Sequence, residues 1–257
     1  MAYVHGYEPR ESRRLDDQAG ALVELLHGDT AYPPGARVLE VGCGVGAQTI
    51  TLAANSPDAR FTSIDVSEDS LAVARTRGLP NVEFRHADLF TMPPETFDHV
   101  FVCFVLEHLA DPPAALQRLK RMLAPGGTIT VIEGDHGSAY FHPDSAAARE
   151  AIDCLVALQP GDALIGRRLY PLLAEAGFAD VRVTPRVVYV DDSRPDLVDG
   201  FTRRTFTAMV EGVRDAAIAR GLIAPERFDQ GIRDLYRTAA GGGTFSYTFF
   251  KAVGWTS

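Results

Sequence analysis

The sequence predicts an α/β fold, a doubly wound and mostly parallel sheet with helices on both faces. From residue 37 onward, short runs rich in β-branched residues alternate with helical stretches, which is the pattern of a parallel sheet. The runs are apolar almost throughout, as residues 100–105 show, and strands buried on both faces have this composition. The chain has 257 residues, 46% hydrophobic and 23% charged, which is the composition of a folded globular protein.

The parallel part of the sheet is expected to contain five strands. They are predicted over residues 37–41, 60–64, 82–86, 99–105 and 128–132. After the second strand, Ser67 is a suitable N-cap, and Gly78 can take the left-handed conformation that ends a helix. Asp111 and Pro112 begin another helix, which Pro-Gly-Gly at residues 125–127 stops.

Helical and strand patterns on either side of these strands predict further elements. Apolar residues at helical spacing indicate an amphipathic helix before the first strand: Leu15, Ala19, Leu22 and Leu26. Beyond the fifth strand we expect two helices and then two strands, over residues 146–158, 168–176, 181–190 and 245–253. Residues 191–243 show helical periodicity without a strand signal, and so long a segment is unusual without structure of its own. We therefore expect a helical cap inserted into the final hairpin.

Charge and cysteine usage exclude several classes of partner. The net charge is −9 and no basic patch forms, so we expect no nucleic-acid partner, since such binding depends on Lys and Arg contacts to phosphate. The three cysteines are widely spaced and suggest no disulfide framework, which fits a cytoplasmic location. No window reaches the ~18 apolar residues of a membrane span, so we expect no membrane partner.

A glycine-rich loop follows the first predicted strand. Gly42, Gly44 and Gly46 alternate with other residues, and Glu40 lies two positions before the first of them. Glycines at alternate positions let the backbone turn tightly and approach a ligand with no Cβ in the way. The spacing differs from the G-x-G-x-x-G of a pyrophosphate site. A tight βα turn with no ligand would use the same glycines.

Acidic residues follow the next two strands. Asp65 ends the second strand, where a carboxylate can accept both hydroxyls of a ribose, as it does in dinucleotide enzymes. Asp88 follows the third strand, where the amino group of an adenine would need an acceptor, and Val66 could supply an apolar wall for the ring. Asp65 could instead cap a helix beside Ser67, and Asp88 could cap a loop.

With Phe-Val-Leu-Glu-His-Leu at residues 104–109 and Leu-Ala-Pro-Gly-Gly at 123–127, this set resembles the class I S-adenosylmethionine-dependent methyltransferases. The resemblance covers about residues 37–133 and is to the branch of ubiquinone/menaquinone-type C-methyltransferases and many small-molecule methyltransferases. It implies S-adenosylmethionine as cofactor and a seven-stranded sheet with an antiparallel last strand. The cofactor contacts that it implies are Glu40, Gly42, Cys43 and Gly44 at the methionine part, Asp65 at the ribose, Val66, Asp88 and Leu89 at the adenine, and the backbone near Phe104 at the amino group.

The sequence pattern and the resemblance together predict an organisation in three parts. Residues 1–34 form an N-terminal lid and helix, residues 35–190 with 244–257 form the cofactor-binding core, and residues 191–243 form a helical cap over the acceptor site. The N-terminal helix of this branch commonly closes over the cofactor. Further cofactor contacts would then come from Tyr3, Tyr7 and Gln18.

The turn after the fifth strand, residues 133–142, should face the acceptor, because ligands bind beyond the carboxyl ends of parallel strands. A histidine titrates near neutrality, and Glu133 and Asp135 flank His136 in the sequence and could orient it as a general base. His5 is the next candidate base. A histidine held in a polar loop would explain the same residues without catalysis.

A metal site at Asp135, His136 and His142 is the other alternative at this turn. Some class I O-methyltransferases hold a divalent cation near this turn, and their ligands include acidic residues after the fourth strand. At that position this chain has Glu107 followed by His108, which differs from their ligand set. We therefore expect no metal.

The function expected from these residues is methyl transfer from S-adenosylmethionine to a small apolar or aromatic acceptor, with natural-product metabolism as one setting. The aromatic residues of the cap and last strand suit such an acceptor: Phe201, Phe206, Phe245 and Tyr247. An NAD-dependent oxidoreductase would share the glycines and Asp65 but has no use for Glu40. A non-catalytic cofactor-binding protein of the same fold is the other alternative, and a homodimer stays open.

Overall fold

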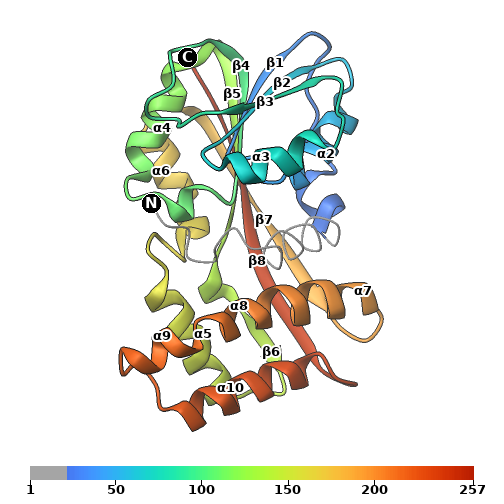
Figure 1. Cartoon of the computed structure of the whole chain (residues 1–257), viewed down its shortest axis with the longest axis vertical. Coiled ribbons are helices and arrows are strands. Elements are labelled where there is room, and N and C mark those ends of the chain that lie inside the picture. The colour runs from blue at the N-terminus through green and yellow to red at the C-terminus, as the bar shows by residue number, and fades with distance from the viewer. Residues whose placement is uncertain (1–21) are drawn as a thin grey trace. The chain divides into compact units, whose positions relative to one another are not determined.

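The computed structural model describes residues 22–257, so the predicted lid, with Tyr3, His5, Tyr7 and Gln18, lies outside the described residues. The chain divides into two compact units. The sheet unit consists of Val23–Glu133, Ile165–Arg186 and Phe250–Ser257, and the helical unit of Gly134–Leu164 and Val187–Phe249 together with Leu22. Figure 1 shows the elements of both units.

Parallel strands form the centre of the sheet unit. They are β1 (Arg37–Val41), β2 (Arg60–Asp65), β3 (Val82–His86), β4 (Phe97–Cys103) and most of β5 (Leu123–Gly134). Their order is β3-β2-β1-β4-β5, and each neighbouring pair is parallel. Val38, Leu39 and Val100 are fully buried, as expected for central strands of a parallel sheet. The carboxyl ends of these strands therefore lie along one edge, where residues 42–46, 65–66 and 104 follow them.

Short helices connect these strands. The α-helices are α2 (Ala47–Asn55), α3 (Glu68–Arg75), α4 (Pro112–Arg121) and α6 (Leu169–Glu175), and η1 (Leu106–His108) and η3 (Ile165–Arg168) are 3₁₀ helices. Both predicted N-caps are confirmed, because Ser67 accepts from the backbone N–H of Ser70 and Asp111 from that of Ala114. Leucines of α4 and α6 pack in the same core cluster as the buried residues of β1, β4 and β5.

The helical unit contains one further strand and most of the remaining helices. Its elements are η2 (His136–Ser138), β6 (Tyr140–His142), α5 (Ala146–Leu158), α7 (Pro195–Leu197), the π-helix η4 (Val198–Thr207), α8 (Ala208–Gly212), α9 (Arg214–Ala219) and α10 (Pro225–Thr238). Helix α10 packs closely on α5, since a Cβ on Gly231 would lie 2.4 Å from the carbonyl oxygen of Ala147. Strands β7 (Ala179–Val190) and β8 (Thr244–Trp255) contribute residues to both units.

The predicted fold class is confirmed, with one change in the number of strands. The described part of the chain has an eight-stranded sheet, ordered β3-β2-β1-β4-β5-β8-β6 with β7 also on β8, where seven strands were expected. The additional strand is β6, which pairs antiparallel with the last strand through Tyr140–Ser246 and His142–Thr244. Three residues carry too short a pattern to predict a strand, because β6 exists through its pairing with β8.

The boundaries of the two units differ from the predicted parts. Residues 191–243 are helical as expected, but residues 135–164 group with them, whereas the sequence pattern assigned them to the core. The role of these residues as a cap over an acceptor stays a prediction. Within residues 22–257, no helix combines the length and the apolar character needed to cross a bilayer.

Candidate functional site

The glycine loop leaves its backbone open at one position. Gly42, Gly44 and Gly46 have φ angles of 71°, 52° and 75°, which favour glycine. A Cβ on Gly42 would lie 2.5 Å from a methyl carbon of Val105, so packing also requires glycine there. A Cβ on Gly44 would meet no atom within 4 Å. A ligand could therefore approach the backbone most closely at Gly44.

Asp65 joins this loop to the start of α3. Its Oδ2 accepts the backbone N–H of Gly44 at 2.8 Å, and its Oδ1 accepts that of Ser67 at 2.8 Å. The predicted helix-capping contact is thus present, and so is a contact to the glycine loop. A carboxylate has about four lone-pair sites, so two backbone contacts leave acceptor capacity for two ribose hydroxyls.

Glu40 is buried beneath the same loop. Its side chain accepts hydrogen bonds from the hydroxyls of Thr49 at 2.8 Å and Ser63 at 2.6 Å. Burial raises the pKa of Glu40 to about 7, and the nearby charge of Asp65 adds to this effect. Glu40 therefore changes charge near neutral pH, and a cation bound beside it would favour the ionised form.

Three residues predicted at an adenine follow β2 and β3. Val66 is an exposed apolar side chain, 59% accessible, and could contact the face of an adenine ring. Asp88 is exposed, and its Oδ1 accepts the backbone N–H of Phe90 at 2.8 Å, which is the predicted loop cap. Leu89 is buried in the core cluster, so only its backbone could contact a ligand.

The segment after β4 has a strained backbone that Glu133 holds in place. Phe104 has a φ of 57°, which a bulky side chain rarely adopts, and such strain often marks a functional segment. This conformation also ends β4 two residues earlier than predicted. The Oε1 atom of Glu133 accepts the backbone N–H groups of Val105 at 3.0 Å and Leu106 at 2.7 Å. The carboxylate thus caps η1.

Glu133 is itself fully buried, and its Oε2 atom has no hydrogen-bond partner among residues 22–257. Burial raises the pKa of Glu133 well above its usual value, and the neighbouring charge of Glu107 raises it further. The prediction that Glu133 orients a catalytic histidine is not tested by these contacts. Sequence reasoning missed its contacts to η1, because they join residues 27 and 28 positions apart.

His136 lies in the helical unit and is buried. Its Nδ1 atom is 2.8 Å from the hydroxyl of Tyr247, a residue 111 positions away, and its backbone N–H donates to the carbonyl of Ala163. Asp135 is the other residue predicted to orient His136; its carboxylate accepts the backbone N–H of Gly137 at 3.0 Å, and the orienting role stays a prediction. Tyr247 is the partner that the sequence did not indicate.

Aromatic side chains surround this histidine and tyrosine. Phe206 of the π-helix lies edge-on to His136, and its ring centre is 5.5 Å from that of Tyr247. Phe201 contacts Tyr247 and Phe249, so residues five apart on the π-helix meet the same strand. The same helix carries Thr202 and Thr207, whose buried hydroxyls have no hydrogen-bond partner in the part of the chain that the structure describes. A π-helix is rare and frequently occurs at functional sites.

Cysteine or metal chemistry has no support in the described geometry. Burial raises the pKa of the Cys43 and Cys103 thiols, so neither is an activated nucleophile. Within residues 22–257, no three His, Cys, Asp or Glu side chains gather closely enough to hold a metal ion. The alternative of a site at Asp135, His136 and His142 is therefore not formed by these residues.

Comparison with known proteins identifies the family. Residues 39–129 match a family model described as a methyltransferase domain. The chain is 34% identical over 181 residues to trans-aconitate 2-methyltransferase of Methylobacterium radiotolerans, an alignment that covers 70% of this chain and 68% of that enzyme. The chain belongs to the class I S-adenosylmethionine-dependent methyltransferases. The resemblance predicted from the sequence is thus confirmed.

Two further relatives agree with this assignment of the methyltransferase. Demethylmenaquinone methyltransferase of Staphylococcus aureus is 36% identical over 110 residues, which are 41% of this chain and 46% of that enzyme. The structure of Haemonchus contortus phosphoethanolamine N-methyltransferase 2, solved with S-adenosylhomocysteine, has a TM-score of 0.55 and 18% identity, over 94% of this chain and 53% of that one. At this identity it shows the shared fold alone. The chain spans about half the length of several curated relatives that it matches.

Proposed function

We propose that this methyltransferase binds S-adenosylmethionine at the carboxyl ends of β1, β2 and β4, and methylates a small apolar or aromatic molecule. The observation that carries the proposal is the joint placement of Asp65 and Gly44. The carboxylate of Asp65, which can accept further hydrogen bonds, accepts the backbone N–H of Gly44. A Cβ on Gly44 would meet no atom of the described residues within 4 Å, so a ligand can approach there. An NAD-dependent oxidoreductase has no support in the comparisons with known proteins.

The sheet unit supplies the residues that we propose hold the cofactor. Asp65 would accept the ribose hydroxyls, and Val66 would cover the adenine, with Asp88 as acceptor for its amino group. Glu40 and the loop at Gly42, Cys43 and Gly44 would lie at the methionine part. The backbone at Phe104, held by Glu133, would contact the amino group.

The helical unit supplies the residues that we propose hold the acceptor. Phe201, Phe206 and Tyr247 offer aromatic surface, and the buried hydroxyls of Thr202 and Thr207 offer polar contacts. The bound cofactor supplies a methyl group already activated by its sulfonium. The protein therefore has mainly to position the nucleophile and exclude water, which can contribute on the order of 7 to 11 kcal/mol.

His136 is the general base that we propose for an acceptor with an acidic proton. If Nδ1–H donates to the hydroxyl oxygen of Tyr247, Nε2 is the nitrogen that would take the proton of the acceptor. The electron pair released on the acceptor then forms the bond to the methyl carbon as the bond from carbon to sulfur breaks. The tyrosine thus acts as a positioning residue, because it determines which nitrogen carries the proton.

Calorimetry with the purified chain tests the cofactor half of the proposal. Asp65→Asn should weaken S-adenosylmethionine binding by roughly 2 kcal/mol, because the ribose hydroxyls lose a charged acceptor while the carbonyl can still accept from Gly44. Asp69→Asn, an exposed change on α3, should bind as the wild type does. Unchanged affinity in a folded Asp65→Asn protein, or binding of NAD and not of S-adenosylmethionine, would remove the proposed site.

The setting of the reaction also remains proposed. A cytoplasmic location rests on the three unpaired, buried cysteines, and a role in natural-product metabolism rests on the aromatic surface near His136. Incubation with labelled S-adenosylmethionine and sets of phenolic, carboxylic and quinone acceptors would identify the class of acceptor.

A further inference from the structure

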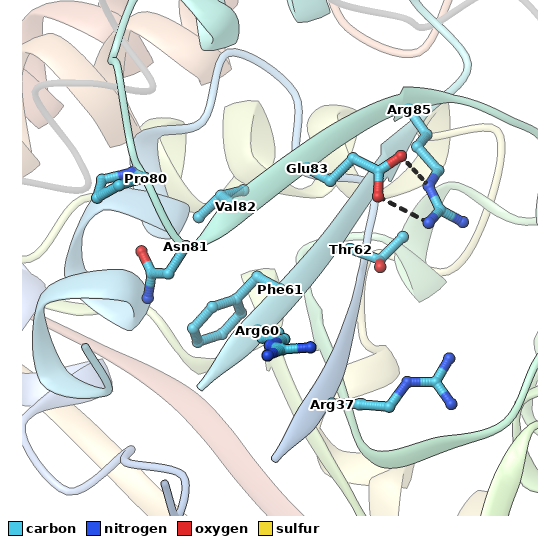
Figure 2. A pocket seen from close by; sticks show the side chains of 9 residues that line it. All are labelled: Arg37, Arg60, Phe61, Thr62, Pro80, Asn81, Val82, Glu83 and Arg85. Atoms are coloured by element: carbon cyan, nitrogen blue, oxygen red, sulfur yellow. Dashed lines mark hydrogen bonds and ion pairs between the residues drawn. The ribbon is translucent and has the colours of Figure 1, made fainter. Parts of the chain in front are cut away.

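A second pocket lies at the opposite ends of the same strands. Its volume is about 380 Å³, and residues at or near the amino ends of β1, β2 and β3 line it (Figure 2). They are Arg37, Arg60, Phe61, Thr62, Pro80, Asn81, Val82, Glu83 and Arg85. The residues proposed to hold the cofactor follow the carboxyl ends of the strands. This pocket is therefore separate from the proposed cofactor site.

The sheet face that forms this pocket carries polar side chains, as expected for a face that no helix after β3 covers. Residues 87–96, between β3 and β4, contain no helix, although a doubly wound sheet normally has a helix in each connection. The strand register places Thr62 opposite Glu83, and Arg37 opposite Arg60. Residues two apart on a strand share a face, so these side chains lie on the same side of the sheet.

The charges on this face are balanced in one part and unbalanced in another. Arg85 bonds to both carboxylate oxygens of Glu83 at 2.7 Å and to Glu95 at 2.8 Å. Figure 2 shows the bonds between Arg85 and Glu83 and draws no bond from Arg37 or Arg60 to the other lining residues. Among the residues that the structure describes, no carboxylate forms an ion pair with Arg37 or Arg60.

Arg37 and Arg60 are also direct neighbours across the sheet. They are register partners on adjacent parallel strands, which lie about 4.8 Å apart. The guanidinium of Arg37 lies over the ring of Phe97, 5.3 Å from its centre, and Asp98 accepts the backbone N–H of Arg37 at 2.8 Å. Like charges in opposite positions on neighbouring strands destabilise a sheet. The chain has a net charge of −9, so a shortage of carboxylates does not explain why these two arginines are not balanced by acidic residues.

We propose that this pocket binds a small organic oxyanion that bridges Arg37 and Arg60. Guanidinium groups on two neighbouring strands can each donate two N–H bonds to a phosphate or to a pair of carboxylates, and the flexible side chain of Arg37 would leave Phe97 to do so. Thr62 adds a hydroxyl, and Pro80 and Val82 provide apolar contacts for the organic part of the ligand. A phosphomonoester and a dicarboxylate share this chemistry. The bound anion would replace the repulsion between the arginines with attraction.

Titrations of the whole chain at low ionic strength test the proposal. The probes are phenyl phosphate, inorganic phosphate and succinate, with calorimetry for affinity and thermal unfolding for stability. We expect saturable binding of phenyl phosphate or succinate with a dissociation constant of about 1 mM or lower. Arg60→Gln should weaken this binding roughly tenfold or more, because one charged donor group is lost.

A reversal of sign distinguishes the site from a general effect of salt. Without a probe, Arg60→Gln should unfold at the same temperature as the wild type or higher, because the repulsion is removed. With a saturating probe it should unfold at a lower temperature than the wild type. The control is Arg121→Gln, an exposed arginine at the end of α4 in the same unit, which should follow the wild type in both conditions.

The outcomes separate clearly. If none of the probes binds saturably, or if all three proteins respond equally, the pocket is a solvated sheet face and the proposal is wrong. Arg37→Gln provides a second variant if Arg60→Gln fails to fold, and it should lose the same affinity. S-adenosylmethionine binding, measured in parallel, should be unchanged in these variants, so failure here is independent of the proposed methyl transfer.

Discussion

Replacing Glu40 with glutamine should change how the stability of the protein depends on pH. The carboxyl is 2% exposed, and it accepts hydrogen bonds from Thr49 and Ser63, which a glutamine carbonyl can also accept. The substitution therefore removes the charge and retains most of the shape and hydrogen bonding. Because every other titrating group is shared, the difference between the two proteins isolates the contribution of Glu40.

The expected magnitude follows from the pKa of Glu40. Burial raises it from 4.5 to about 7, and each pH unit of difference corresponds to about 1.4 kcal/mol. The folded protein holds this proton more tightly than the unfolded chain does, so the stabilising contribution is present below pH 4.5 and is lost as pH rises through 7. The free energy of unfolding of Glu40→Gln minus that of the wild type should therefore increase by about 3 kcal/mol over this range.

Urea denaturation at half-unit steps between pH 4.5 and 8.5 measures this difference directly. The same logic links Glu40 to the cofactor, whose sulfonium and ammonium groups would favour the ionised carboxylate. Binding of S-adenosylmethionine near pH 6.5 should then release protons in the wild type, and fewer in Glu40→Gln. Calorimetry in two buffers of different ionisation enthalpy measures that release.

Two results would contradict this reasoning. If the free energies of unfolding of the two proteins run parallel across the pH range, Glu40 ionises normally and burial does not control its pKa. If the pH dependence appears as expected but both proteins release the same number of protons on binding, the buried carboxyl titrates as described and the cofactor does not lie beside it.

Substitutions at Gly44, Glu133 and His136 test the other parts of the proposed site. Gly44→Ala and Gly78→Ala should each lower the free energy of unfolding, measured by urea denaturation, by about 1 kcal/mol. Both glycines have a positive φ, and the new Cβ would meet no described atom within 4 Å. Only Gly44→Ala should weaken cofactor binding. The free energy of unfolding of Glu133→Ala should be about 2 kcal/mol lower than that of Glu133→Gln, since only the glutamine retains an acceptor for the backbone N–H groups of η1. His136→Ala should lower turnover by roughly 10² to 10⁴, less at high pH, with unchanged cofactor affinity, whereas wild-type turnover at every pH would exclude a base.

The parts of the fold that local patterns determine could be predicted well. β1 and β3 have the predicted bounds, as does α5, because each is a short periodic segment with clear end signals. The π-helix could not be predicted, since its ten residues have an α-helical pattern in the sequence. Its aromatic residues pack on the last strand, as Phe206 does on Phe245, and such contacts between distant segments are not visible in a local pattern. Helix α4 ends at Arg121, before the predicted stop, because β5 already begins at Leu123.

The proposed cofactor-binding residues could be predicted from the sequence because their positions also follow from local patterns. Gly42, Gly44 and Asp65 act through backbone conformation and a single carboxylate, and each lies directly after a strand that the pattern locates. Their relative placement follows from the parallel order of β1 and β2 alone. Tyr3, His5 and Gln18 lie outside the described residues, so their roles stay predictions.

The residues around His136 depend instead on contacts between distant segments. The hydroxyl of Tyr247 meets the histidine only because β8 lies beside residues 134–136, where a Cβ on Gly134 would lie 2.3 Å from that hydroxyl. A glycine at this position thus makes room for the tyrosine, although nothing in the local sequence distinguishes it from a turn glycine. The same packing gives the histidine its hydrogen-bond partner and its aromatic neighbours. A substitution at Gly134 should therefore displace the hydroxyl of Tyr247 from His136 and lower turnover without changing the side chain of the histidine, which places control of the proposed base in the packing of the backbone.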